Sequence, residues 1–205
     1  MIEARAPVSR RRIAIKVYDR RDMARPQFEG MSEAWLLGAR VARPLFCDDA
    51  DGIVATAWAG DESMIEALSK NATAREVQIV AAGEWLADWH RRGAVGLRAF
   101  APELLTDPLA DLRAAGTLGP NCAAALAALD RRASALTGAP CDEVRVFGDF
   151  AAKNLILNPQ GPVAIDRPRR MRGPAARDHA RFLLDLAINL ARSELSVGAR
   201  DARLA

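Results

Sequence analysis

Two aspartates and an asparagine in the carboxyl-terminal part of the chain have residue types and a spacing suited to metal-assisted phosphoryl transfer. Asp149 follows a short apolar segment, Asn154 comes five residues later, and Asp166 ends another apolar segment. The stretch Asn158-Pro-Gln-Gly161 is typical of a hairpin turn, which would bring Asn154 and Asp166 together. Because Mg²⁺ prefers carboxyl and amide oxygens, these two residues are candidate ligands. Asp149 would then stand free to accept a proton from an attacking hydroxyl.

A lysine within an apolar strand forms a second candidate site. Lys16 ends the segment Ile13-Ala-Ile-Lys16, and the chain has only three lysines among its 29 basic residues. An ammonium group there is costly unless an anion meets it. Glu33, on the helix expected to follow, is the partner we expect, and Glu29 lies one turn earlier as an alternative. A lysine held by a helix glutamate and directed at phosphates is a kinase arrangement. The other interpretation is that Lys16 lies on the exposed face of an edge strand.

The elements that must position these residues can be predicted from hydrophobic periodicity. The first sixty residues predict a strand over 13–18, a helix over 28–39 and strands near 43–47 and 53–58. The apolar side chains expected on that helix's buried face are Phe28, Met31, Trp35 and Leu36. Pro174 is expected to begin a long helix that buries Leu183, Leu186, Ala187 and Leu190.

Between these parts the pattern is mostly helical. Asp61 is the expected cap of a helix over 63–69, and a helix behind Thr73 carries Trp85 and Trp89 as core residues. Further helices are expected over 102–115 and 120–136, the latter burying Ala124, Leu126, Ala128 and Leu129. The two histidines, His90 and His179, are expected to pack or cap. We therefore predict an α+β fold with a reduced N-terminal lobe (1–60) and a helical C-terminal lobe (61–205) that carries the catalytic loop and the hairpin.

Composition excludes several classes of protein. The chain has 205 residues, of which 50% are hydrophobic and 27% charged, and a net charge of +3. These values exclude a disordered tail or a fibre, and the aromatic content of 5% argues against a nucleic-acid-binding surface. The three widely spaced cysteines indicate a reducing compartment, and no apolar segment predicts a secretory signal or a membrane span. We expect a cytoplasmic protein that acts on a small molecule.

The motifs together resemble the aminoglycoside phosphotransferase and choline kinase family, which has a protein-kinase-like fold. The similarity includes Lys16, Glu33, the segment from Phe147-Gly-Asp149 to Asn154, and Ile-Asp166. Two further passages are similar to the family's helical lobe, namely Leu86-Ala-Asp-Trp-His90 and Gly173-Pro-Ala-Ala-Arg-Asp178. The resemblance extends from about residue 13 to residue 190.

The resemblance implies an ATP-dependent phosphotransferase. In such an enzyme Lys16 would contact the phosphates, Glu33 would orient it, Asp149 would be the catalytic base, and Asn154 and Asp166 would hold Mg²⁺. The stretch from Thr56 to Gly60, with Trp58, would be the interlobe hinge that contacts adenine.

The chain also departs from the family pattern. Phe147 replaces a histidine, and no glycine precedes Gly30, although the family carries a glycine-containing loop before its lysine strand. These departures leave open an alternative, a catalytically impaired kinase-like protein with a binding or regulatory role. Arg167, Arg169 and Arg170 directly follow Asp166, and clustered guanidinium groups bind anions and repel polycations. We therefore expect a neutral or anionic acceptor rather than an aminoglycoside.

Overall fold

The computed structural model describes residues 2–5, 11–70, 73, 75–103, 114, 119–168 and 171–201. The chain divides into two compact units, one formed by Met1–Ala94 with Val144–Ala205 and the other by Val95–Glu143. The lobe boundary predicted near Gly60 falls inside the first unit and stays a prediction. Most of the helix predicted over 102–115 lies outside the described residues. No helix in the described part of the chain is long and apolar enough to span a membrane.

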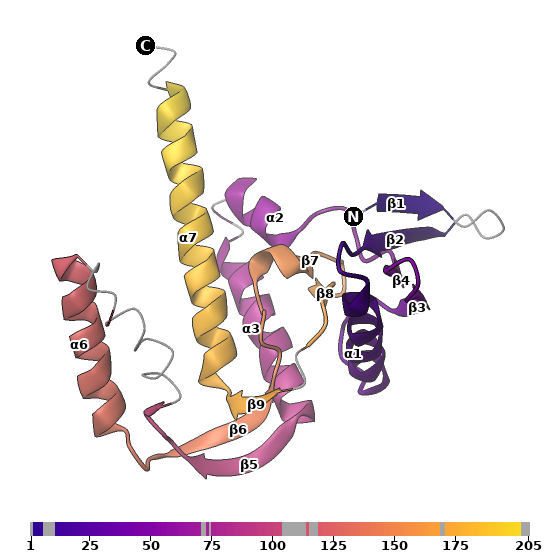
Figure 1. Ribbon diagram of the computed structural model, residues 1–205. Helices are drawn as coiled ribbons and strands as arrows, with labels where there is room; N and C mark the ends of the chain where they lie inside the picture. The colour runs from indigo at the N-terminus through magenta and orange to yellow at the C-terminus, as the bar shows by residue number, and fades with distance from the viewer. Residues whose placement is uncertain are drawn as a thin grey trace. The chain divides into compact units, whose positions relative to one another are not determined.

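The first unit begins with a four-stranded antiparallel sheet (Figure 1). Its strand order is β1-β2-β4-β3, and the strands are β1 (Ile2–Arg5), β2 (Arg12–Val17), β3 (Pro44–Asp48) and β4 (Ile53–Ala57). Lys16 on β2 pairs in register with Val54 on β4. The three strands predicted for this region are confirmed. Strand β1 was not predicted, and it shows that Lys16 does not lie on an edge strand.

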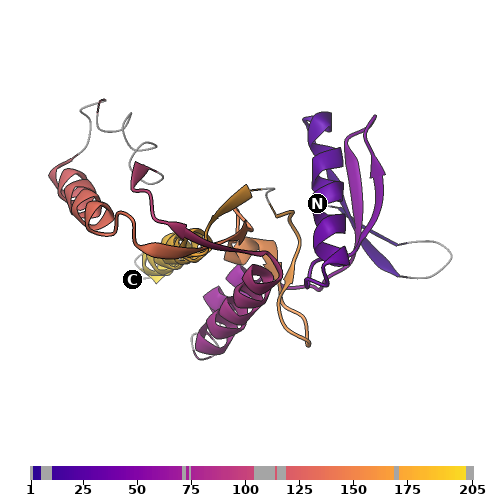
Figure 2. The ribbon, with the colours of Figure 1, turned by 90° about the horizontal axis from the view of Figure 1, so that it is seen from below.

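Helix α1 (Ala24–Leu36) packs against β3 and β4, and Figure 2 shows it lying along the sheet. It begins four residues earlier than expected because Pro26 falls in its first turn, where the missing N–H is harmless. It ends before Gly38, whose φ of 75° suits a helix C-terminus. The predicted buried face is wrong apart from Met31, since Trp35 and Leu36 are exposed. Close packing instead selects small side chains, and the residues buried on α1 are Ala24, Gln27, Gly30, Met31 and Ala34.

The rest of the first unit is a helical layer around a short hairpin. Helices α2 (Met64–Lys70), α3 (Arg75–Arg92) and α7 (Ala176–Asp201) accompany the hairpin of β7 (Leu155–Ile156) and β8 (Val163–Ala164). The predicted turn over 158–161 is confirmed. The predicted cap of α2 is wrong, because Ser63 and Glu66 form a reciprocal capping box while Asp61 accepts a hydrogen bond from the Trp58 indole.

An aromatic cluster forms the core of this layer. Trp85 and Trp89 are buried, as predicted, and pack with Phe147 and Phe150 at centroid distances of 5.3 to 6.3 Å. Phe150 also contacts Phe182 of α7. This packing fixes the chain on both sides of Asp149.

Helix α7 differs from its prediction at its start and on its buried face. Pro174 ends strand β9 (Met171–Pro174), and the helix begins at Ala176. Leu186 is buried as expected, whereas Leu183 is exposed and its neighbour Phe182 is buried in its place. The face is shifted because α7 also buries Asp178 and Asp185, whose carboxylates accept backbone hydrogen bonds from the loop around Asp149.

Two short stretches attach the N-terminal sheet to the hairpin. Ala164 donates its N–H to the Arg40 carbonyl and accepts one from Ala42, at 3.0 and 2.8 Å. At the other stretch, the Asn158 amide donates to the Ala59 carbonyl at 3.1 Å. The segment that ends at Asp166 is therefore tied to the sheet that carries Lys16.

The second unit contains most of β5 (Ala94–Ala99), the first part of β6 (Pro140–Val146) and α6 (Pro120–Ala135). Strand β6 continues into the first unit, and the strand order of this sheet is β5-β6-β9. Helix α6 was predicted. Its expected core stripe was not correct, because Ala124 is exposed and Leu126, Ala128 and Leu129 are only half-buried.

Candidate active site

Asp149 lies in the loop that follows β6, in contact with two residues. Arg181 of α7 donates to its Oδ1 from Nε at 3.1 Å and from Nη2 at 2.9 Å. Asn154 donates from Nδ2 to its Oδ2 at 3.2 Å and to its carbonyl at 3.1 Å. The side chain of Asp149 remains 31% exposed, so its carboxylate is oriented by the protein and still reachable from solvent. Arg181 was not expected from the sequence.

The loop itself is held by a buried carboxylate. Asp178 is fully buried and accepts hydrogen bonds from the backbone N–H groups of Phe147, at 2.6 Å, and Gly148, at 2.7 Å. Its Oδ2 also lies 2.9 Å from His90 Nε2. A carboxylate acts only as an acceptor, so the proton is on His90 Nε2. His90 and Asp178, which belong to the two passages similar to the family's helical lobe, therefore contact each other next to the loop that carries Asp149. His90 has the packing role expected for it.

Phe147 fills the position where the resemblance has a histidine. Its ring is completely buried and lies edge-on to Trp85 and Trp89. Aromatic pairs of this geometry contribute about 1 kcal/mol beyond the area they bury. Packing, rather than a side-chain hydrogen bond, therefore fixes the ring that precedes Asp149.

Asn154 and Asp166 lie at the two ends of the β7–β8 hairpin. Ile165 donates its N–H to the Asn154 carbonyl at 3.0 Å, which places the two candidate ligands on neighbouring backbone segments. Because Asn154 Nδ2 is directed at Asp149, its Oδ1 is the atom that would be available to a cation. The described residues contain no cluster of three or more His, Cys, Asp or Glu side chains that could hold a metal. One amide and one carboxylate oxygen fit Mg²⁺, which keeps several water or phosphate ligands.

Lys16 projects from β2 toward this same place. Its Nζ lies 3.6 Å from Asp166 Oδ1 and 5.0 Å from the centre of the Tyr18 ring. The hydroxyl of Tyr18 is buried without a hydrogen-bond partner in the described structure. Burial and the charge of Asp166 raise the pKa of Tyr18 far above its usual range, so this phenol is neutral.

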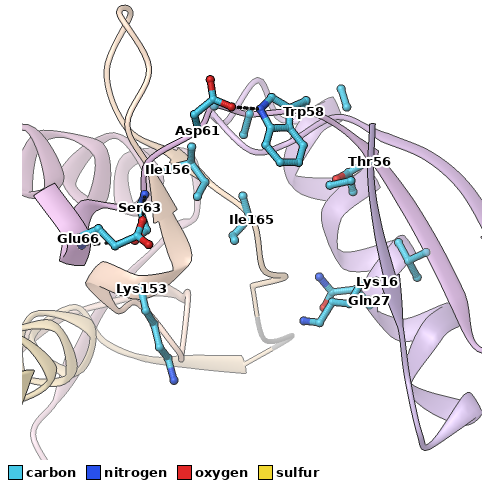
Figure 3. Close-up of a pocket in the computed structure, with 15 residues that line it drawn as sticks. Lys16, Gln27, Thr56, Trp58, Asp61, Ser63, Glu66, Lys153, Ile156 and Ile165 are labelled. Atoms are coloured by element: carbon cyan, nitrogen blue, oxygen red, sulfur yellow. Dashed lines mark hydrogen bonds between the residues drawn. The ribbon is translucent and has the colours of Figure 1, made fainter. Parts of the chain in front are cut away.

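A pocket of about 270 Å³ opens between β2, β4 and the hairpin (Figure 3). Two of the chain's three lysines, Lys16 and Lys153, line it. The stretch from Thr56 to Gly60, expected to contact adenine, forms another wall. Gly60 is required there, because a Cβ atom would lie 2.6 Å from the Leu157 carbonyl oxygen. The pocket joins an apolar wall to the ammonium groups of Lys16 and Lys153, and its lining also includes the carboxylates of Asp61 and Glu66. An apolar wall beside cationic groups suits an aromatic ring that carries phosphates.

Glu33, the predicted partner of Lys16, is bound elsewhere. Its carboxylate accepts hydrogen bonds from Arg145 of β6, from Nη1 at 2.6 Å and also from Nη2. The α1 side chain that lines the pocket is Gln27, which sequence reasoning did not single out. A polar residue on an otherwise apolar helix face was the signal that could have identified it. The pairing of Lys16 with Glu33 stays a prediction.

The arginines after Asp166 are described only in part. Arg167 is half-buried and packs close to Gly30 of α1. A Cβ atom added at Gly30 would lie 3.0 Å from the Cβ atom of Arg167. Arg169 and Arg170 lie outside the described residues. The acceptor-proximal role expected for all three stays a prediction, as do the roles of the other site residues.

Comparison with known proteins yields structural neighbours only. No protein-family model matches the sequence, and no curated protein matches it either. Among solved structures, a choline kinase from Streptococcus pneumoniae is 16% identical, with a TM-score of 0.55 over 94% of this chain and 69% of that one. A glucosamine kinase, solved with glucosamine, ADP and inorganic phosphate, is 16% identical, with a TM-score of 0.56 over 94% of this chain and 57% of that one.

A third neighbour is a candidate fructosamine-3-kinase from Thermobifida fusca, 18% identical with a TM-score of 0.50 over 96% of this chain and 78% of that one. The fold is protein-kinase-like. The predicted α+β class and the resemblance to the aminoglycoside phosphotransferase and choline kinase group are thus confirmed at the level of fold. This chain spans between 57% and 78% of the length of these kinase-like neighbours.

Proposed function

We propose that this chain is an ATP-dependent phosphotransferase that moves the γ-phosphate to a hydroxyl group of a small, neutral or anionic molecule. The observation that carries the proposal is the 3.6 Å separation of Lys16 Nζ and Asp166 Oδ1, which joins two motifs at opposite ends of the sequence. Lys16 lines a pocket whose wall includes the predicted hinge and Ile165, the residue before Asp166. The kinase-like fold supports the same function.

The nucleotide would enter the pocket with its base against the stretch from Trp58 to Gly60. Ile156 and Ile165 would contact the adenine ring, and backbone groups of the hinge would hydrogen-bond its edge. Lys16 and Lys153 would neutralise the phosphates. In this reading residues 1–60 are a reduced N-terminal lobe, residues 61–205 are the helical lobe, and Val95–Glu143 is a separate compact part of the latter.

Asn154 and Asp166 would hold Mg²⁺, which supplies charge neutralisation for the transferred phosphoryl group. Asp149 would accept the proton of the acceptor hydroxyl as the acceptor oxygen bonds to the γ-phosphorus. The bond from that phosphorus to the bridging oxygen breaks at the same time, and ADP leaves. Arg181 and Asn154 position the Asp149 carboxylate for this step through the hydrogen bonds they already make.

The charge of the acceptor follows from the cations near Asp149. Arg181 donates directly to the proposed base, and Arg167 follows the proposed metal ligand. A polycationic acceptor would have to approach these guanidinium groups. Neutral and anionic hydroxyl compounds meet no such repulsion, and anionic ones gain an ion pair.

One observation favours the alternative, a kinase-like protein impaired in catalysis. Arg181 donates two hydrogen bonds to Asp149 Oδ1, so an acceptor hydroxyl is left with Oδ2, which already accepts one hydrogen bond from Asn154. Such a protein would bind Mg²⁺-ATP without transferring phosphate.

Calorimetric titration with Mg²⁺-ATP, followed by a screen of hydroxyl acceptors for ADP release, tests the proposal. We expect binding, and turnover with a neutral or anionic acceptor but not with kanamycin-like polycations. Binding without turnover of any acceptor would support the impaired alternative. Absence of Mg²⁺-ATP binding would refute both the enzyme and the impaired alternative. The expected charge of the acceptor would be refuted if kanamycin were turned over efficiently by the wild type and equally well by a variant with Arg169 and Arg170 replaced by alanine.

A further inference from the structure

Among the polar side chains of helix α1, Gln27 and Glu33 lie on different faces. Gln27 is 4% exposed and lies on the buried face with Met31 and Ala34. Glu33 is six residues further along, which is about 120° away around a helix of 3.6 residues per turn. Its side chain is 41% exposed and is held by Arg145. Only Gln27 therefore reaches the pocket from this helix.

The amide of Gln27 lacks a partner within the part of the chain that the structure describes, although it lines the pocket together with Lys16. Figure 3 shows both side chains projecting into the same space. The amide is not among the fully buried polar atoms that lack a partner, so it faces the space of the pocket. An amide in that position, with no hydrogen bond to a described residue, is suited to a bound ligand that completes its hydrogen bonds.

Lys16 has one ionic partner among the described residues, Asp166, at 3.6 Å. Asp166 is also the proposed metal ligand, so a metal and Lys16 draw on the same carboxylate. A glutamate at position 27 would give Lys16 a second, permanent counter-ion. The glutamine instead leaves the ammonium group able to move from Asp166 to an incoming phosphate.

We propose that Gln27 is the α1 residue that positions Lys16 and contacts the nucleotide phosphates, in place of Glu33. The amide can accept a hydrogen bond from the Lys16 ammonium at Oε1 and donate one to a phosphate oxygen from Nε2 at the same time. A carboxylate could only accept, and it would repel the phosphate. This inference rests on the proposed nucleotide function and assigns one residue of that site.

The test compares adenosine, which has no phosphates, with Mg²⁺-ADP by calorimetry for the wild type and three variants. We expect Gln27→Leu and Gln27→Glu to weaken Mg²⁺-ADP binding about tenfold, since a hydrogen bond to a charged group contributes at least that factor. Adenosine affinity should stay within about twofold, because the adenine contacts are intact. The matched control, Glu33→Gln on the same helix, should bind both ligands as the wild type does.

Folding is followed by thermal unfolding of the same samples. Gln27→Leu removes no hydrogen bond to a described residue and keeps a side chain of similar size, so we expect its Tm to stay close to that of the wild type. If ADP and adenosine affinities fall together, or if only Glu33→Gln weakens ADP binding, the assignment of Gln27 is overturned while the nucleotide site stands. A wild-type protein that binds neither ligand overturns the assignment and the proposed function together.

Discussion

The two sides of the candidate site differ in how completely the protein itself satisfies their polar groups. On the side of the catalytic loop, Asp178 accepts hydrogen bonds from two backbone N–H groups and contacts His90, and Asp149 is bound by Arg181 and Asn154. On the side of β2 and α1, the Tyr18 hydroxyl is buried without a partner in the described structure, and the Gln27 amide faces the pocket.

This difference indicates that the two sides of the site have different roles. Asp149 and Asp178 are each held by several hydrogen bonds, although Trp89 Nε1 in the aromatic cluster is buried without a partner among the described residues. Carboxylates held in this way are rigid, and rigidity is what positions a catalytic base. Unsatisfied groups beside a pocket retain hydrogen-bonding capacity for a ligand. The catalytic loop is thus preformed, whereas we expect the region around Lys16 to be completed by the nucleotide.

The largest effect that we expect comes from the preformed side. Asp149→Asn keeps the size of the side chain and removes its basicity, so phosphoryl transfer should fall about 10³-fold. Mg²⁺-ADP affinity should stay within about threefold, because a base acts in the transition state and not in nucleotide binding. Steady-state ADP release and calorimetry give the two values. Wild-type turnover in this variant would mean that Asp149 is not the base.

The support of the loop can be broken at Asp178. Asp178→Ala leaves two N–H groups and His90 Nε2 without an acceptor in the core, and should lower the free energy of unfolding by about 3 kcal/mol. Urea denaturation measures this loss. Asp178→Asn retains one acceptor oxygen and should lose less. Equal stability of Asp178→Ala and the wild type would show that the loop is not held by this carboxylate. The catalytic loop would then be no more preformed than the region around Lys16.

A smaller effect is expected where the two sides meet, at Asp166. In the wild type, Mg²⁺ should strengthen ADP binding about tenfold, a range typical of a site whose ligands are a carboxylate and phosphates. Asp166→Ala should abolish this dependence on metal. In metal-free buffer containing a chelator, the variant should bind ADP at least as tightly as the wild type, because Lys16 no longer has a competing counter-ion. A tenfold gain from Mg²⁺ in Asp166→Ala would remove Asp166 from the metal site.

The smallest effect is expected outside the site, at the pair of Glu33 and Arg145. A bidentate, partly exposed ion pair should contribute about 1 kcal/mol to stability. A double-mutant cycle with Glu33→Gln and Arg145→Gln, measured by urea denaturation, should give a coupling energy of that size. Turnover should not change in Glu33→Gln. A large loss of turnover without loss of stability would restore Glu33 as the partner of Lys16.

The parts of the fold that the sequence predicted are those with short-range signals. Apolar alternation placed β2, β3 and β4, and the turn residues placed the β7–β8 hairpin. The helix faces were less predictable, because packing distance decides between large and small side chains. On α1 the close approach of Arg167 at Gly30 favoured small residues, while Trp35 was left exposed.

The same reasoning applies to the site. The acid–amide–acid set was visible because Asp149, Asn154 and Asp166 lie within one short segment. Arg181 and Gln27 could not be assigned, since their roles depend on how α7 and α1 are rotated about their axes. Helix rotation follows from tertiary packing, and local periodicity constrains it weakly when polar residues lie on the buried face.

The two attachments between the N-terminal sheet and the hairpin have a consequence for motion. Ala164 is bonded to the stretch from Arg40 to Ala42, and Asn158 to Ala59. Arg92 and Arg145 hold helix α1 as well, through the Leu37 carbonyl and the Glu33 carboxylate. Because these ties do not share one axis, we expect the wall of the pocket that carries Lys16 to stay in place without a hinge motion. The amides of Ala42 and Ala164 should accordingly exchange hydrogen with solvent slowly.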